Sequence, residues 1–304
     1  MSSLLTNSSA MTALQTLSMT NKNMATTQNR ISTGLRVGGA EDNAAYWSIA
    51  TTMRSDNMAL SAVNDSLGLG AAVVDTMYTS MNSTVDVLNE IKAKLTTASG
   101  AGVDRAKIQS DIDQLQDQLG TIASSAVFNG ESWLQEDSTT ANATKSVIAS
   151  FSRDAAGLFT LDSIDIDVTD IRLFDSGADT GLMDRDYTAG GTTVAIEDID
   201  VSALTDSAAD RTTIQETIAV VDLAIAAVTD AATDLGSVKK RVDLQQTFVS
   251  NLTDAVDRGI GQLVDADMNK ESTRLQALQT QQQLGIQALS IANQGAQNIL
   301  SLFR

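Results

Sequence analysis

An unbroken heptad pattern runs through residues 53–95, which read MRSDNMALSAVNDSLGLGAAVVDTMYTSMNSTVDVLNEIKAKL. Every seventh residue of this stretch, from Met53 to Leu95, is apolar. A second tract shows the same spacing from Ile214 to Leu263. A stripe with a period of 3.5 residues, sustained over this length, is typical of helices that supercoil around a partner. Because neither tract can bury its stripe alone, we expect the two to pair as a long antiparallel coiled-coil rod.

The composition excludes several classes of function. The 304 residues include 38 acidic and 20 basic side chains, which gives a net charge of −18. Phosphate binding needs a basic surface, so we expect no nucleic-acid partner and no adhesion to an anionic membrane. The sequence contains no histidine and no cysteine. The usual general base, the thiol nucleophile and the common zinc sites are therefore absent.

Two short motifs invite a ligand-binding interpretation and do not support it. Asp162, Asp165, Asp167 and Asp170 alternate with other residues, but the calcium-loop spacing with a glutamate at its twelfth position is absent. A solvated strand face is the better interpretation. Gly38-Gly39 is followed by no Gly-Lys-Ser/Thr, which a phosphate loop requires. We expect no catalytic residue, no cofactor and no metal ion.

Local signals divide the chain into elements. An amphipathic helix is predicted over the first 35 residues, and Gly34 ends it. Asp42 is a candidate N-cap for the first long helix, which should end near residues 99–102 (SGAG). Asp104 can begin a shorter helix, and Asn129-Gly130 marks a turn beyond it.

The periodicity changes in the middle of the chain. Residues 163–169 (SIDIDVT) alternate strictly between polar and apolar, which predicts a half-buried strand. Phe159 and Leu161 suggest a preceding strand, and Val194 and Ile196 suggest a later one. The fold class predicted is therefore mainly α, with a small β-rich central insert.

The predicted order of segments is nested. Residues 1–41 and 264–304 form the two parts of a terminal helical domain, and residues 42–139 and 206–263 form the two parts of the rod. Residues 140–205 form the insert. No run of 18 apolar residues is present, and the first 30 residues lack the features of a cleaved secretory signal. We therefore expect no membrane-spanning helix. If the protein leaves the cell, we expect a route that needs no cleaved signal.

Motifs at both ends of the chain resemble those of bacterial flagellins. At the N-terminal end these are residues 30–37 (RISTGLRV) and 40–45 (AEDNAA). At the C-terminal end they are residues 264–268 (VDADM), 283–288 (QLGIQA) and 292–302 (ANQGAQNILSL). The pieces occur in the order and orientation of the family, so together they are far more specific than any one of them.

The resemblance implies a secreted subunit that polymerises into the extracellular flagellar filament, where sister flagellins can join it. It implies terminal helices that line an inner tube, a rod domain outside it and an insert that faces solvent. It also implies contacts with hook-associated and cap proteins, with the flagellar export apparatus, and with an export chaperone at the C-terminal helix. The residues expected to carry the inner-tube contacts are apolar positions of the two terminal helices: Leu17, Met24, Ile31, Leu35, Leu278, Ile286, Leu289, Leu300 and Phe303.

Three alternatives remain open from the sequence. A hook-filament junction protein would have similar termini and would adapt or cap rather than form the bulk of a filament. A signalling rod of the chemoreceptor type would also show long heptads, but it needs a membrane anchor. An enzyme limited to carboxylate chemistry is the third, and no pair of acids stands out for it.

Overall fold

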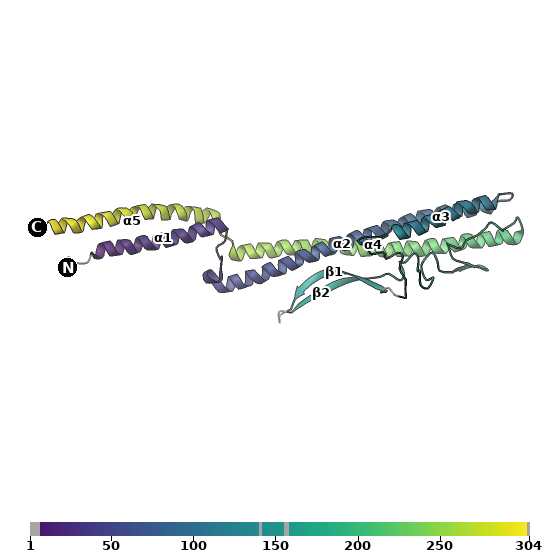
Figure 1. Ribbon diagram of the computed structural model, residues 1–304, viewed down its shortest axis with the longest axis horizontal. Helices are drawn as coiled ribbons and strands as arrows, with labels where there is room; N and C mark the ends of the chain where they lie inside the picture. The colour runs from purple at the N-terminus through teal and green to yellow at the C-terminus, as the bar shows by residue number, and fades with distance from the viewer. Residues whose placement is uncertain (1–6, 140–141, 155–157, 303–304) are drawn as a thin grey trace. The chain divides into compact units, whose positions relative to one another are not determined.

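The computed structural model describes residues 7–139, 142–154 and 158–302, and in them it contains five helices and four strands (Figure 1). The helices are α1 (Ser8–Thr33), α2 (Ala40–Ala98), α3 (Arg105–Ser125), α4 (Ala208–Val264) and α5 (Met268–Leu302). The strands are β1 (Thr144–Arg153), β2 (Phe159–Asp167), β3 (Tyr187–Ala189) and β4 (Thr192–Val194). The predicted fold class is confirmed: long helices occupy both halves of the chain, and a small antiparallel β insert lies between them.

The chain divides into two compact units. Residues 1–58 together with 253–304 form the terminal unit, and residues 59–252 form the central unit. Helices α2 and α4 each contribute to both units.

The capping residues explain where most helices begin and end. The side chain of Asn7 accepts a hydrogen bond from the backbone N–H of Ala10 at the start of α1. Gly34 ends this helix with a left-handed φ of 73°, and its N–H donates to the carbonyl of Arg30. Asp104 caps α3 as predicted, through the N–H of Lys107.

One predicted cap was wrong by a single residue. Asn43 has a non-helical backbone (φ −161°, ψ 101°) inside α2, and its side chain accepts the N–H of Tyr46. Asp42 instead accepts the N–H of Gly38, in the turn that precedes the long helix. Asn43 is therefore the N-cap of the continuous part of α2.

The heptad residues of the central unit form its core. From Leu60 to Leu95 on α2, and from Ile214 to Val249 on α4, every residue of the two main stripes is buried. Ion pairs fix the register: Asp75 pairs with Lys239, and Lys92 with Asp222 at 2.5 Å. Advancing from Asp75 to Lys92 along α2 moves the partner back from Lys239 to Asp222 by the same number of residues. The two helices are therefore antiparallel and in constant register.

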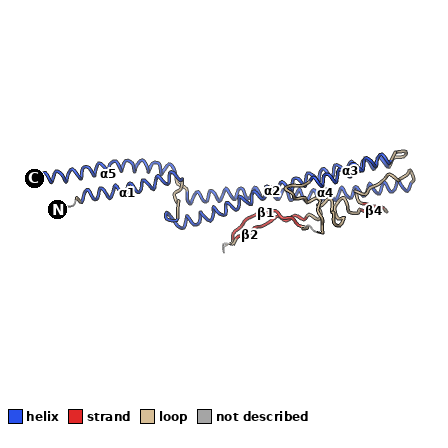
Figure 2. The backbone as a smooth tube through the Cα atoms, viewed as in Figure 1, coloured by secondary structure: helices blue, strands red, loops and turns tan. Residues whose placement is uncertain are grey.

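The insert packs on these helices through a hairpin of β1 and β2 (Figure 2). Val147 of β1 approaches α2 so closely that a Cβ at Gly70 would overlap both of its methyl groups. On the other helix, Gln245 donates to the carbonyl of Ala149 at 2.9 Å. Ile164 and Ile166 of β2 are buried beneath the hairpin, in agreement with the predicted alternation.

The strand boundaries differ from those predicted. Phe159 and Leu161 belong to β2 itself and not to a preceding strand. The preceding strand is β1, which the sequence did not indicate because Val147 and Ile148 follow each other without alternation. Val194 lies in β4 as predicted, whereas Ile196 lies beyond its end and is fully buried.

Candidate assembly surfaces

The terminal unit is built on an antiparallel pair of α1 and α5, which lie side by side (Figure 1). At one end of the pair, Asn7 donates to the carbonyl of Ala292 at 3.0 Å. In the middle, Gln282 donates to Asn21 at 2.8 Å. At the other end, Arg30 pairs with Glu271 at 3.5 Å.

The facing side chains of the pair follow a heptad pattern on both helices. The less exposed residues of α1 are Ala10, Ala13, Leu17, Thr20, Met24, Thr27 and Ile31, and those of α5 are Glu271, Leu275, Leu278, Gln282, Gly285, Leu289 and Ala292. Several positions on this seam are polar or small, so the pair buries little apolar surface. A helix pair of this kind gains less stability from packing than a seam of large apolar residues.

Most of the residues predicted for inner-tube contacts lie on this seam. Leu17, Met24, Ile31 and Leu289 are half-buried and Leu278 is buried, so these side chains face the partner helix of the same chain.

The remaining predicted residues have other environments. Ile286 lies off the seam and is exposed. Leu35 is half-buried in a cluster with Val37, Ile260 and Val264. Leu300 belongs to α5, but its side chain is not among those described, and Phe303 lies outside the described residues.

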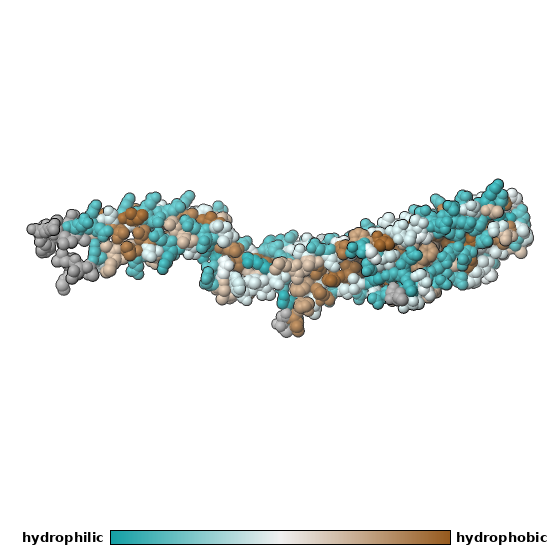
Figure 3. Space-filling view, in the orientation of Figure 1, coloured by the Kyte–Doolittle hydropathy of each residue, from teal (hydrophilic) through white to brown (hydrophobic). Residues whose placement is uncertain are grey.

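Large apolar side chains stand exposed on the outer faces of the pair. These are Met11, Leu14 and Met19 of α1 and Leu284, Ile286 and Ile291 of α5, with 54–69% of each residue accessible to solvent. In Figure 3, brown apolar surface is visible among the hydrophilic surface of this pair. Among them only Ile286 was predicted as a contact residue. The others could have been found by assigning one heptad stripe to intrachain pairing and then asking which large apolar residues remain.

The segments that follow α1 and α4 are tied to each other by backbone hydrogen bonds. The N–H groups of Arg36 and Val37 donate to the carbonyl of Val264 at 2.7 and 3.2 Å, and the N–H of Ala266 donates to Gly34. The guanidinium of Arg36 donates to the carbonyls of Gln262 and Leu263. These last carbonyls of α4 have no partner within the helix, so Arg36 completes its C-terminal end.

The hairpin of the central unit also exposes apolar side chains. Ile148, Leu158, Phe159 and Leu161 are each at least 40% exposed. Brown surface gathers over β1 and β2 in Figure 3.

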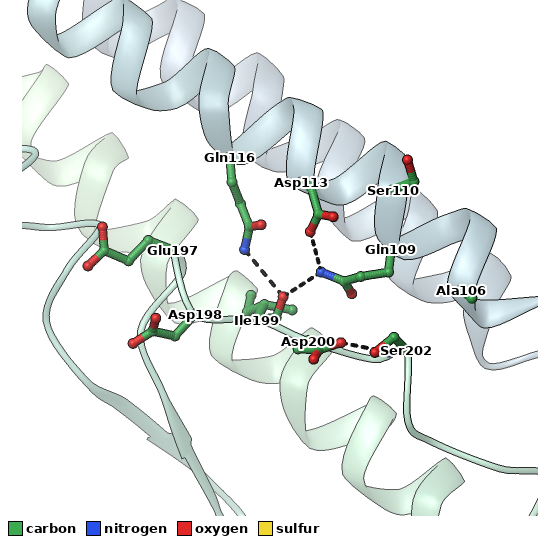
Figure 4. Close-up of a pocket in the computed structure, with 10 residues that line it drawn as sticks. All are labelled: Ala106, Gln109, Ser110, Asp113, Gln116, Glu197, Asp198, Ile199, Asp200 and Ser202. Atoms are coloured by element: carbon green, nitrogen blue, oxygen red, sulfur yellow. Dashed lines mark hydrogen bonds between the residues drawn. The ribbon is translucent and has the colours of Figure 1, made fainter.

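A hollow of about 430 Å³ lies between α3 and the loop after β4 (Figure 4). Gln109 and Gln116 extend from α3 toward this loop, and both amides donate to the carbonyl of Ile199. Gln109 also donates to Asp113 at 2.7 Å and accepts the N–H of Val201. The glutamines therefore hold the loop.

A buried polar network holds the loop between β2 and β3. Burial opposes the ionisation of Asp175, but hydrogen bonds from Ser138, Thr180 and Gly177 outweigh it and hold its pKa well below the ordinary value. The guanidinium of Arg172, only 1% exposed, lies 3.5 Å from the Asp175 carboxylate.

Asp184 belongs to the same network and accepts the N–H of Asp175. Burial raises the pKa of Asp184, and the charges of Asp175 and Asp179 add to the effect. Apart from Ser138, which lies just before the insert, the residues of these contacts all lie within it, so the network has a structural role.

The described residues contain no cluster of acidic side chains arranged to hold a metal ion. Nor is any helix in the described ranges both long and apolar enough to cross a membrane.

The fold and its surfaces define a mainly helical structural protein with exposed apolar faces. Comparison with known proteins identifies its family. Residues 4–139 match the bacterial flagellin N-terminal helical region, and residues 218–303 match the bacterial flagellin C-terminal helical region. Flagellin C of Rhizobium meliloti strain 1021 is 50% identical, and flagellin A of the same strain is 44% identical. A flagellin of Brucella melitensis biotype 1 is 45% identical, and all three alignments cover 100% of both chains.

Among solved structures, that of Bacillus cereus flagellin aligns with 60% of this chain and 86% of its own, with a TM-score of 0.39 and 21% identity.

The chain therefore belongs to the bacterial flagellin family. It is a structural subunit of the flagellar filament, and it is not an enzyme.

Proposed function

We propose that the α1–α5 pair forms the inner tube of the filament and that its exposed apolar side chains are buried between copies of the chain. The observation that carries this proposal is the set of large exposed apolar residues off the intrachain seam, on both helices. Monomeric proteins rarely expose large contiguous apolar patches, and such surfaces mark contact sites. Burial of these side chains favours association, since each fully buried residue contributes about 1.5–3 kcal/mol.

The nine residues predicted for the inner tube act in two ways in this proposal. Leu17, Met24, Ile31, Leu278 and Leu289 hold α1 against α5 and so create the surface, and Leu35 anchors the segment that follows α1. Ile286 belongs to the exposed surface itself. Leu300 and Phe303, two apolar residues near the C-terminal end of the sequence, are proposed to make contacts of the same kind.

The proposed domains follow the nested order of the sequence. Residues 1–41 and 264–304 form the inner-tube domain, residues 42–139 and 206–263 form the rod domain outside it, and residues 140–205 form the outer segment. The dense apolar seam of α2 and α4 supports a rod domain that is stable by itself, whereas the polar seam of α1 and α5 supports a pair that becomes stable on assembly.

Further partners follow from the family. The chain is proposed to leave the cell through the flagellar export apparatus without signal cleavage, with a chaperone on α5 before export. In the extracellular filament it then meets hook-associated and cap proteins, and sister flagellins join it there. Exposed apolar residues of α5 support a chaperone contact, because these side chains need cover before assembly.

Seeded polymerisation of the full chain tests the proposal. Purified monomer is mixed with filament fragments and a precipitating salt and is examined by electron microscopy. We expect long uniform tubes with a central channel, whereas persistent monomers or short rings would contradict the filament function. Leu289→Asp and Ile31→Asp should abolish filaments and leave the central unit helical by circular dichroism; normal filaments from either variant would refute the assigned roles.

A further inference from the structure

The net charge of the chain is confined to one of its two units. Of the 20 basic residues 8 fall in the terminal unit, and of the 38 acidic residues 8 also fall there, so this unit is formally neutral. The central unit holds the other 12 basic and 30 acidic residues and with them the whole charge of −18. The net charge makes copies of the central unit repel one another, which favours contacts that bring a positively charged face to it.

The terminal unit has such a face, in a groove of about 780 Å³. Five basic residues line it: Arg30, Arg36, Arg258, Lys270 and Arg274. Three of them, Arg258, Lys270 and Arg274, are exposed and form no ion pair with any carboxylate that the structure describes. Lys270 and Arg274 lie one turn apart on α5, so both can reach a single partner.

Four acidic residues, Asp257, Asp265, Asp267 and Glu271, also line the groove. Glu271 pairs with Arg30, and Asp267 caps α5 by accepting the N–H groups of Asn269 and Lys270. A third carboxylate, that of Asp257, accepts the amide of Asn57. The groove therefore holds one basic residue more than it holds acidic ones, and its exposed cations Arg258, Lys270 and Arg274 remain without an ion-pair partner in the described residues.

The central unit offers a matching surface at the hollow beside α3 (Figure 4). Four acidic residues line the hollow: Asp113, Glu197, Asp198 and Asp200. No basic residue lines it. Glu197 and Asp198 are exposed, and neither carboxylate is paired with a cation in the described part of the chain. Partial burial raises the pKa of Glu197, and the charges of Asp184, Asp198 and Asp179 add to the effect. A nearby cation would reduce the repulsion between Glu197 and these carboxylates.

We propose that the cationic groove of one copy docks on the acidic hollow of a second copy. The contact joins two different surfaces of the same chain, so it is heterologous and can continue from copy to copy without closing. It thereby supplies an attractive contact for a unit that otherwise repels its own kind. The proposal rests on the filament function and adds to it a polar contact distinct from the apolar one of α1 and α5.

Charge reversal of the full chain tests the docking. Lys270→Glu with Arg274→Glu makes both surfaces acidic, whereas Glu197→Lys with Asp198→Lys leaves Asp113 and Asp200 in place and makes the hollow neutral. The first pair replaces the attraction by repulsion and the second removes it, so each should raise the critical concentration for filament growth at low salt about tenfold or more. A chain that combines all four changes again places unlike charges at the exchanged positions of the two surfaces, so its critical concentration should return to within about threefold of the original.

The controls separate this contact from a general effect of charge. Asp86→Lys with Glu90→Lys, at exposed positions of α2, makes the same change in charge as the Glu197 and Asp198 variants. Lys240→Glu with Arg241→Glu, at exposed positions of α4, makes the same change in charge as the Lys270 and Arg274 variants. Control variants that impair growth as strongly as the test variants would overturn the proposal, and so would a combined chain that shows no recovery. If the original chain forms no filaments, the filament function fails; if every variant polymerises normally, only this docking fails.

Discussion

Replacing two exposed apolar residues of α5 should weaken the filament without weakening the monomer. Ile291 is 69% exposed and Leu284 is 58% exposed in the chain by itself. Full burial of such a side chain is worth about 1.5–3 kcal/mol, so covering the exposed part contributes about 1–2 kcal/mol at each position. Leu284→Gln and Ile291→Ser remove this contribution and exchange residues of similar helix propensity.

The double variant should therefore lose about 3 kcal/mol of subunit addition. At 1.4 kcal/mol for each factor of ten, this corresponds to a critical concentration about 100-fold higher. The assay is sedimentation of filaments grown from seeds over a range of monomer concentrations. The midpoint of thermal unfolding of the monomer should change little, because most of each residue is exposed in the chain by itself.

A matched variant, Gln287→Ser, changes an exposed polar residue of the same helix and should leave growth unaltered. If the double variant polymerises at the original concentration, these side chains are not buried in the filament and the reasoning is refuted. A lower unfolding temperature of the monomer would show that the residues support the chain itself.

Three further predictions concern the central unit. Gly70→Ala should destabilise it by about 1–3 kcal/mol, because the new methyl group overlaps Val147. Gly120→Ala, at an open position inside α3, should stabilise it by up to about 1 kcal/mol. Urea unfolding measures both changes in the free energy of unfolding, and equal changes in the two variants would contradict the packing. Asp175→Asn should cost about 3 kcal/mol at pH 7, because it leaves Arg172 buried without its partner. The pKa of Asp175 is depressed in the folded state, so the difference in stability between the original chain and the variant should be constant above the ordinary aspartate pKa of about 4. The difference should shrink as the pH falls through the depressed pKa. A difference in stability that does not depend on pH would exclude the charge of Asp175 as its cause. For Glu197→Gln the dependence of stability on pH should be reversed, because burial raises the pKa of this carboxyl. The variant should be more stable than the original chain at neutral pH, and this difference in stability should disappear below about pH 4. A variant less stable than the original chain at pH 7 would contradict the prediction.

The heptad tracts could be predicted from the sequence because the spacing of their apolar residues follows the buried face of each helix. Leu67, Met81 and Leu88 are fully buried at the positions that the stripe assigned to them. The Asn129-Gly130 turn was equally accessible, since both residues adopt positive φ, which these residue types tolerate best.

Strand β1 could not be predicted in the same way. Its apolar residues Val147 and Ile148 are adjacent, and a register shift between Ile148 and Ser150 breaks the pattern further, so pairing with β2 rather than local alternation defines the strand. The close contact of Val147 with Gly70 depends on tertiary packing and leaves no local signal beyond the glycine.

The assembly surface was only partly accessible from the sequence. The stripe that contains Leu17 and Met24 is apolar enough to be recognised, but a stripe does not reveal whether its partner is the same chain or another. The structure assigns these residues to the pairing of α1 with α5. Leu14 and Ile291 remain exposed, and they lie at positions that a single heptad register leaves out.

The central claim is that exposed residues of α5 become buried when the chain polymerises. The sequence contains no cysteine, so Ile291→Cys provides a single thiol at the surface in question. Its rate of reaction with a charged maleimide is measured in the monomer and in the filament, with Asp170→Cys on the exposed insert as the reference. The account predicts rapid labelling of Cys at position 291 in the monomer and strong protection in the filament, with the reference thiol equally reactive in both. Equal labelling at position 291 in monomer and filament would contradict it.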